Sequence, residues 1–575
     1  MDNQRLIIWG FFAIMAYLTW QAWMQDYSPR PQPVETQQEA LPAPDEIDAD
    51  TTIDTLPDLA DDEADLPVVS AGPAEAETST AAEADASVIT VITDVLEMEI
   101  DTRGGTIVLA RVLRYPVAKD QPQTKIRLLD STTENYGELR SWLRAKDNET
   151  GAPGAKTVFE TSKTRFELGD DNTLEVPLRW TSPAGVVFEK RFVFKRGSYA
   201  IELEQRVDNT TDAPWRGDQV TQVLRRSYAQ ERSMFNVDSY SFDGALIYNG
   251  SKAEKLKRDD LIDDGPMNFT SDDGWYASIE HHFLTAIVPE PPATNIYQVR
   301  INDNLLTASV ISAPQTIQPG ASGSFQRTLF VGPKLQLQLE DIHPKLKLSV
   351  DYGWLTILSQ PLFWLLAWVH KYVGNWGWSI IAVTILIKLA FYKLTESSGR
   401  SMAKMREIQP RMKALQERYK DDRPALSQAM MELYKREKIN PAAGCLPILI
   451  QMPFFLAFYW VLVESVEMRQ APFALWITDL SSRDPYFILP LIMGVAMLAQ
   501  QKLNPAPADP VQAKVMQIMP IMFTVFFAFF PSGLVLYWVT NTLLSIAQQW
   551  KINKVVHAEA MARKSGKKKK PPKDA

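Results

Sequence analysis

The stretch WGWSIIAVTILIKLAFYKLT, residues 376–395, decides the fold of this chain. As a helix it rises about 30 Å, which matches the hydrocarbon core of a bilayer. Lys388 stands thirteen residues into the stretch, where a charge costs about 2.5 to 3.5 kcal/mol on membrane-insertion scales. Thr384 and Tyr392 lie one turn to either side of it on the same helical face. The stretch therefore predicts a membrane span with one polar stripe.

Four more apolar runs follow, and they carry polar side chains and prolines of their own. We expect spans at about 444–464, 486–502, 515–531 and 533–550, which complete a membrane core over residues 376–550. The prolines leave helical carbonyls without intrahelical partners. Together with the polar side chains, they indicate a groove that contains water. The expected groove residues are Lys388, Thr384, Tyr392, Gln451, Tyr537, Trp538, Asn541 and Ser545.

Two interpretations of Lys388 remain open at this point. Its side chain can snorkel to the inner headgroups beside Tyr392 and Lys393. Alternatively, the nearest carboxylate in these spans is Glu464 at an outer edge, so Lys388 marks a site that receives an anionic guest.

Basic residues fix the orientation of the chain. Residues 396–440 hold eleven Lys or Arg against seven Asp or Glu, and the tail at 551–575 holds nine basic residues and two acids. Both segments therefore belong in the cytoplasm. Residues 6–23 are uncharged and follow Arg5, so residues 1–27 are predicted to be an uncleaved signal anchor with a cytoplasmic N-terminus. A topology of six spans with both termini in the cytoplasm agrees with the charged residues that flank each span.

A further apolar segment, residues 354–372, would change the number of spans if it crossed the bilayer. The basic loop at 396–440 and the basic tail would then lie on the wrong side of the membrane. Its Gln360-Pro361 pair and its tryptophans suit a helix that lies in the outer headgroup layer. We therefore expect an amphipathic interfacial helix within residues 341–375. Its expected apolar face consists of Trp354, Ile357, Leu358, Pro361, Leu362, Leu365, Trp368, Val369 and Tyr372.

The region between the first span and this helix divides into two parts. Residues 28–87 hold sixteen Asp or Glu and no aromatic residue, a composition typical of a disordered acidic tether. Residues 88–340 show short alternating runs such as VITVITDVLEMEI (88–100) and GVVFEKRFVF (185–194), punctuated by turn signals. Alternation of this kind predicts a large antiparallel β-sandwich, which the topology places in the periplasm.

Residues with catalytic potential are scarce. His281 and His282 follow Glu280 directly, but the three lack the spacing of metal ligands. The chain also has no GxxxxGK[ST] phosphate loop, no HExxH and no GxSxG. We therefore predict a protein that is not an enzyme, with no catalytic residue, cofactor, metal site or DNA partner.

The basic loop at 396–440 has a pattern of its own. Met and Leu side chains recur at helical spacing on both sides of Asp421-Asp422-Arg423-Pro424, so we expect a hairpin of two antiparallel helices. A Met-rich face can be hairpin core, or an adaptable surface for apolar peptides. The expected contact residues for substrate or ribosome are Met402, Met405, Met412, Asp421 and Met430.

Several stretches are far more specific than generic hydrophobic strings: SMAKMREIQP (401–410), NPAAGCLPILIQMPFFLAFYW (440–460), VEMRQAPFALWITDLSSRDPYFILP (466–490) and FPSGLVLYW (530–538). Through them the chain resembles the YidC family of bacterial inner-membrane insertases, within the wider YidC/Oxa/Alb family, and most of all its Pseudomonas-like gammaproteobacterial form. The soluble region matches more loosely, through LSVDYGWLTILSQPLF (348–363).

The resemblance implies five helices around a groove that is open to the cytoplasm and to lipid, and a periplasmic β-supersandwich. It implies a single groove cation that receives the polar segment of a substrate. The family commonly has arginine at the position of Lys388 and proline at the position of Lys393. A lysine keeps the charge but lacks the fork geometry of a guanidinium. Implied partners are the Sec translocon (SecYEG and SecDF), the ribosome at the basic tail and hairpin, and membrane lipids.

The expected function is therefore a membrane protein insertase and chaperone, which inserts and folds nascent inner-membrane proteins and helps to assemble them. Polar segments enter the groove and apolar segments pass the third and fifth spans into lipid, without nucleotide hydrolysis. One alternative is a lipid or small-solute transporter that uses the same groove. Another is a sugar-binding β-domain that the spans only tether.

Overall fold

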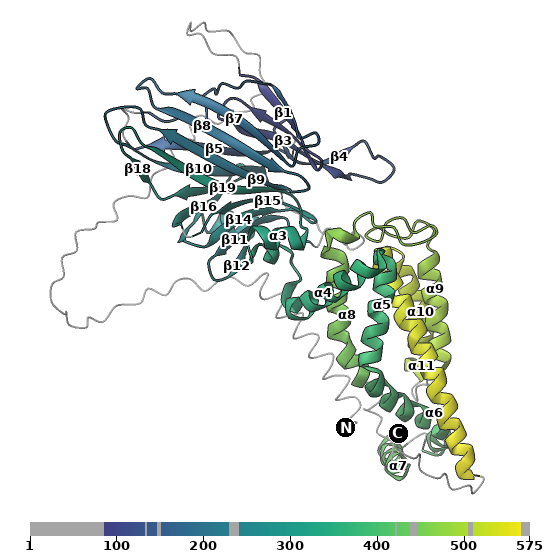
Figure 1. Ribbon diagram of the computed structural model, residues 1–575. Helices are drawn as coiled ribbons and strands as arrows, with labels where there is room; N and C mark the ends of the chain where they lie inside the picture. Colours follow the sequence, from purple (N-terminus) through teal and green to yellow (C-terminus); the bar gives the residue numbers. More distant parts are fainter. Residues whose placement is uncertain are drawn as a thin grey trace, which may run out of the picture. The chain divides into compact units, whose positions relative to one another are not determined.

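The computed structural model describes residues 86–564, except 133–134, 147–150, 229–240, 292, 420–421, 438–445 and 504–509. The expected signal anchor (1–27), nearly all of the expected acidic tether (28–87), Asp421 and the tail beyond Lys564 lie outside the described residues. Figure 1 shows the described part as a β-rich region followed by a group of helices.

Two sheets make up the β-rich region, and the described strands pair antiparallel except β1 with β6. The larger sheet has eleven strands in the order β13 (Met267–Ser271), β16 (Asn295–Asn302), β17 (Leu305–Ser312), β10 (Trp215–Arg226), β5 (Gly137–Ala145), β4 (Lys125–Asp130), β3 (Thr106–Pro116), β2 (Leu96–Asp101), β1 (Val88–Ile92) and β6 (Arg165–Glu167), with β18 (Gln315–Ile317) beside β10. The smaller has eight, in the order β12 (Ala253–Leu256), β11 (Gly244–Asn249), β14 (Gly274–Ile279), β15 (Phe283–Pro289), β19 (Ser322–Pro333), β9 (Ala200–Asp208), β8 (Val187–Lys195) and β7 (Thr173–Thr181).

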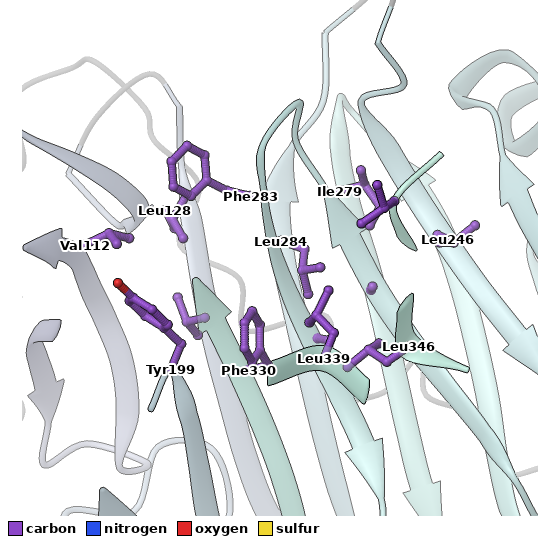
Figure 2. Packing of buried hydrophobic residues seen from close by; sticks show 14 of the residues in the cluster. Val112, Leu128, Tyr199, Leu246, Ile279, Phe283, Leu284, Phe330, Leu339 and Leu346 are labelled. Atoms are coloured by element: carbon purple, nitrogen blue, oxygen red, sulfur yellow. The ribbon is translucent and has the colours of Figure 1, made fainter. Parts of the chain in front are cut away.

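The alternation in the sequence explains these strands. Along β8, Phe188, Lys190, Phe192 and Phe194 are buried while the residues between them are partly exposed, as expected for a strand with one face on a core. Figure 2 shows side chains of both sheets, such as Val112 and Phe330, gathered with Leu339 and Leu346 in one cluster. The sheets therefore share a hydrophobic core.

The connection from the sheets to the helical region is short and ordered. It contains α3 (Gln336–Ile342), η3 (Leu346–Ser349) and η4 (Gly353–Leu355), while a further short helix, α2 (Arg258–Asp263), follows β12. The sequence did not predict α2 or α3, because each helix is shorter than two helical turns and shows no helical periodicity.

The helical region contains α4 (Thr356–Val373), α5 (Trp376–Ala390), α6 (Tyr392–Arg418), α7 (Arg423–Arg436), α8 (Leu446–Glu464), η6 (Val466–Met468), α9 (Ile488–Leu503), α10 (Pro510–Phe527) and α11 (Ser532–Lys564). Helix α11 packs against α5, α6, α8 and α9, and Figure 1 shows it running the length of this region. Among the described helices, none alone has the length and hydropathy of a membrane span, although α5 and α6 reach that threshold together across a 68° bend.

The helix expected over 376–395 ends five residues early. Helix α5 stops at Ala390, and α6 begins at Tyr392 in a new direction. Two polar side chains meet the carbonyls at this break: Thr395 Oγ1 donates to Phe391 O at 3.0 Å, and Gln548 Nε2 donates to Tyr392 O at 3.2 Å. Both contacts lie at the start of α6, where they supply hydrogen-bond donors to the carbonyls beside the break.

One side of α4 packs against other helices. Its buried residues are Ser359, Leu362, Phe363, Leu366 and Val369, and they face α5 and α8. Ser359 Oγ donates to Ala457 O at 3.1 Å. Of the expected apolar face, Leu362 and Val369 are buried, whereas Trp354, Ile357, Trp368 and Tyr372 are exposed. The expected face is therefore divided between packing on other helices and the exposed surface, and its interfacial location stays a prediction.

Candidate functional site

The side chain of Lys388 points from α5 toward α11. Its Nζ donates a hydrogen bond of 2.8 Å to Ser545 Oγ, and Ser545 Oγ donates to Asn541 O at 2.7 Å. Lys388 is only half-buried, and no acidic side chain among the residues described forms a salt bridge with it. We call Lys388, Ser545 and Asn541 the Lys388 site. It holds a positive charge whose partner is a neutral hydroxyl.

Polar contacts continue from the Lys388 site toward the bend at Phe391. Gln451 Nε2 on α8 lies 3.4 Å from Thr395 Oγ1 on α6, and Gln548 on α11 bonds the Tyr392 carbonyl as described above. Thr384 is buried, and its Oγ1 donates to Ile380 O at 2.6 Å within α5. Five of the expected groove residues thus lie in this polar region, while the Thr384 hydroxyl serves its own helix.

Tyr537 and Trp538 occupy a different environment, a cluster of aromatic rings between α8, α10 and α11. The Tyr537 ring lies 5.9 Å from that of Phe455 and 4.9 Å from that of Phe458. Trp538 contacts Phe455 at 4.7 Å and Phe527 at 4.9 Å. We call Phe455, Phe458, Phe523, Phe527, Tyr537 and Trp538 the aromatic cluster. The density of Phe and Trp in three separate apolar runs is the sequence signal for this cluster, but no spacing within one run predicts that the runs meet.

The hairpin helices α6 and α7 pack on each other through the expected methionines. Met412 is buried with Ile408 and Leu433, and Met405 and Met430 pack against them. Met402 is half-buried outside this group. At least part of the Met-rich face is therefore hairpin core.

Contacts at the far end of α8 involve the histidine pair. The Nε2 atoms of His281 and His282 each lie 3.1 Å from Val463 O, and the two rings stack at 3.7 Å. Burial lowers the pKa of His282 well below its usual value, so its ring is neutral at physiological pH. Ser241 Oγ donates to Glu464 Oε1 at 2.7 Å. These contacts give the histidines a structural role, and no group of three metal-binding side chains occurs in the described part of the chain.

A second set of contacts joins the β3–β4 connection to the segment after η6. Gln470 Nε2 donates to Pro116 O at 2.9 Å, Arg469 Nη2 to Val117 O at 3.2 Å, and Lys119 Nζ to Thr478 O. Polar contacts with the sheets therefore cover this end of the helices, opposite to the end that carries the hairpin.

Two family models match consecutive parts of the chain. One is described as the YidC periplasmic domain and matches residues 88–365. The other is described as the 60Kd inner membrane protein and matches residues 368–559. Together they account for both the sheets and the helices.

Curated relatives match the chain over nearly all of its length. The membrane protein insertase YidC of Thioalkalivibrio sulfidiphilus is 46% identical over 99% of this chain and 100% of the relative. The protein of that name from Stutzerimonas stutzeri is 44% identical over 97% and 100%. A crystal structure of an active YidC insertase covers 81% of this chain and 92% of its own, at 18% identity and a TM-score of 0.36. The chain therefore belongs to the YidC family of membrane protein insertases.

Proposed function

We propose that this protein inserts integral membrane proteins into the bacterial inner membrane and assists their folding and assembly. The observation that carries the proposal is the Lys388 site: a half-buried cation, in the last turn of the apolar helix α5, whose hydrogen-bond partner is the neutral Ser545 hydroxyl. A carboxylate entering from a substrate can replace that hydroxyl and gain a charge-assisted bond.

The proposed insertion is passive. The acidic or polar terminus of a nascent protein enters a groove at Lys388, which shortens the apolar path that it must cross. Its apolar segment then moves past α8 and α10 into lipid. Burial of about twenty apolar residues, at roughly 25 cal/mol per Å², supplies the free energy without nucleotide hydrolysis. The membrane potential adds about 2.3 kcal/mol per negative charge for each 100 mV.

The proposed topology has six spans, with both termini in the cytoplasm and residues 88–340 in the periplasm as a β-sandwich. Five spans, built on α5, α8, α9, α10 and the first half of α11, form the core, and α4 lies at the outer membrane surface. The exposed aromatic side chains of α4, Trp364, Trp368 and Tyr372, suit that interface. The basic excess in residues 396–440 supports a cytoplasmic hairpin.

The proposed partners follow from charge and from the family. Nascent membrane proteins are the substrates. The hairpin offers Met402, Met405, Asp421 and Met430 as contact residues for substrate or ribosome, whereas Met412, also expected there, is buried in the hairpin core. The lysine-rich tail binds the ribosome, because lysine clusters attract polyanions. Anionic lipid is a competing target for the same charges. The Sec translocon (SecYEG and SecDF) is a further partner.

The experiment that tests the function uses pure protein alone in liposomes, with a small single-span substrate that has a short acidic translocated tail. We expect protease-protected insertion well above the rate in empty liposomes. Equal rates in the two preparations would refute the insertase function. Efflux of lipid or small solute with no insertion would instead favour the transporter alternative.

A deletion separates the remaining alternative. If the membrane core is the working part, a chain that lacks most of residues 88–340 still inserts the substrate. If the spans only tether a sugar-binding β-domain, that chain is inactive and the isolated domain retains the whole function.

A further inference from the structure

A buried polar layer crosses the β-rich region, away from the Lys388 site. Its side chains point from each sheet toward the other, and every one is at most 3% exposed. The members are Ser141, Gln219, Thr221, Asn295 and Tyr297 on the larger sheet, and Lys190, Gln205 and Arg327 on the smaller sheet.

Strand register places the members on the larger sheet on one face. Tyr297 is opposite Val310, Val310 is opposite Thr221, and Thr221 is opposite Ser141. Residues opposite each other in a sheet point to the same side. Asn295 and Gln219 come two residues before Tyr297 and Thr221, so they share that side as well.

The smaller sheet presents its members to the same layer. Lys190 is opposite Gln205, and Gln205 is opposite Phe325, two residues before Arg327. Gln205 Nε2 lies 3.4 Å from Ser141 Oγ, and Lys190 Nζ donates to Ser141 O at 2.5 Å. The polar faces of the two sheets therefore meet.

Two separate hydrophobic clusters flank the layer. Two residues away in one direction along β5, β8 and β9 lie members of one cluster: Leu143, Phe188 and Val207. Two residues away in the other direction lie members of the second: Leu139, Phe192 and Leu203. Strand β19 is shifted relative to this order, because Phe325 is opposite Gln205 and Arg327 is opposite Leu203. The polar layer thus interrupts the core between two apolar blocks.

Hydrogen bonding within the layer is incomplete. Lys190 Nζ has hydrogen-bond acceptors, since it donates to Gly104 O at 2.5 Å and to Gly105 O at 3.3 Å as well as to Ser141 O. Seven other buried atoms have no partner among the described residues: Arg327 Nε and Nη2, Gln219 Nε2, Tyr297 OH, Thr221 Oγ1, Gln205 Oε1 and Asn295 Oδ1. Five of these seven can donate. Exchanging the nitrogen and oxygen of a Gln or Asn side-chain amide does not give the Arg327 guanidinium an acceptor. The layer therefore needs a further group that accepts hydrogen bonds.

The charge of Arg327 also indicates that the layer needs an anionic partner. Burial lowers the pKa of its guanidinium to about 10, so it stays positive at neutral pH. In the described part of the chain no carboxylate forms a salt bridge with Arg327 or Lys190. The acid that acts on Tyr297, Asp273, is exposed and pairs with His343 Nε2 at 3.0 Å. A buried cation without a counter-charge is strongly unfavourable.

We propose that this layer binds a small inorganic anion of halide size, held by the Arg327 guanidinium with a donor from the Tyr297 hydroxyl. Such an anion supplies both the missing counter-charge and the missing acceptor. The side chains of the layer are almost fully buried, so the site is closed to solvent and is proposed to admit a small anion and not a large organic one. The site ties the two sheets together at the point where the hydrophobic core is interrupted.

Hydrogen exchange of the full-length protein in detergent tests the proposal. Backbone exchange of β9, β10 and β19 is compared in sodium chloride and in sodium gluconate at equal ionic strength, because gluconate is too large for the layer. We expect exchange through unfolding to slow in proportion to chloride once its concentration exceeds the dissociation constant. Crystals grown in bromide should show an anomalous peak beside Arg327.

Variants separate the site from a general salt effect. Arg327→Met removes the charge at similar length and should abolish the chloride dependence. Arg327→Lys retains the charge and should keep a weaker response, which preserves the test if Arg327→Met does not fold. Arg206→Met on β9 is the matched control, because Arg206 is half-exposed and pairs with Asp208. Equal exchange in chloride and gluconate for the unaltered protein, with no bromide peak, would mean that only water fills the layer and would overturn the proposal.

Discussion

Lys388 and Ser545 connect α5 to α11 through a single hydrogen bond of 2.8 Å from Nζ to Oγ. The serine donates its own proton to Asn541 O, so it can accept from Lys388 while remaining bonded to its helix. This arrangement holds the ammonium in place without neutralising it.

We expect Ser545→Ala to change insertion of an acidic-tailed substrate by no more than about threefold. A hydrogen bond from a charged donor contributes about 1.5 to 3 kcal/mol, but a substrate carboxylate takes the place of the serine during insertion, so little of this contribution is expected in the insertion rate. Initial insertion rates in proteoliposomes provide the measurement. A loss as large as that of Lys388→Ala would show that the hydroxyl, rather than the charge, is essential.

Trp538 is expected to hold α8, α10 and α11 together. Its ring contacts Phe455 on α8 and Phe527 on α10, so Trp538→Ala leaves a cavity shared by three helices. We predict destabilisation of about 2 kcal/mol or more, measured as a lower unfolding midpoint in detergent. Trp538→Phe should recover most of the loss. Trp368→Ala on the exposed side of α4 is the control, and an equal loss there would contradict a specific role for the cluster.

Glu467 gives the contact between α3 and η6 a pH dependence. Burial raises the pKa of its carboxyl to about 7, and it accepts a hydrogen bond from the Gln336 backbone. Gln336 Nε2 in turn donates to Tyr352 OH at 2.6 Å. Because the folded-state pKa lies above the unfolded value of about 4.5, the stabilisation is complete below pH 4.5 and is lost as pH rises through 7.

We therefore predict faster amide exchange in residues 336–352 at pH 8 than at pH 5, after correction for the intrinsic pH dependence of exchange. Glu467→Gln, which stays neutral, should remove most of that difference. If the variant and the unaltered protein respond identically to pH, Glu467 is not the titrating group.

The sequence predicted those features that depend on local pattern. Alternation over 185–194 identified β8, and the break before Pro424 separated α6 from α7, with Asp422 capping α7 through a bond from Ala425 N. Lys388 was found because a charge inside an apolar run is costly wherever the run packs.

Features set by distant contacts were not predicted. The break after α5 has one of its hydrogen-bond donors on Gln548, more than 150 residues away, and the packed face of α4 depends on α5 and α8. The environment of Trp538 follows from which helices meet, and no spacing rule states that. The position of Lys190 in the alternation of β8 does indicate an inward side chain, but a lysine is rarely fully buried, so its burial was not predicted.

The central claim is that the charge of Lys388 recruits acidic substrate segments. Two single-span substrates that differ only in an acidic or a neutral translocated tail are inserted by the unaltered protein, by Lys388→Ala and by Lys388→Arg in liposomes. We predict that the acidic tail is inserted at least tenfold faster by the unaltered protein and by Lys388→Arg, as a differential of about 1.4 kcal/mol requires, and that Lys388→Ala loses this preference. An unchanged preference in Lys388→Ala would contradict the account.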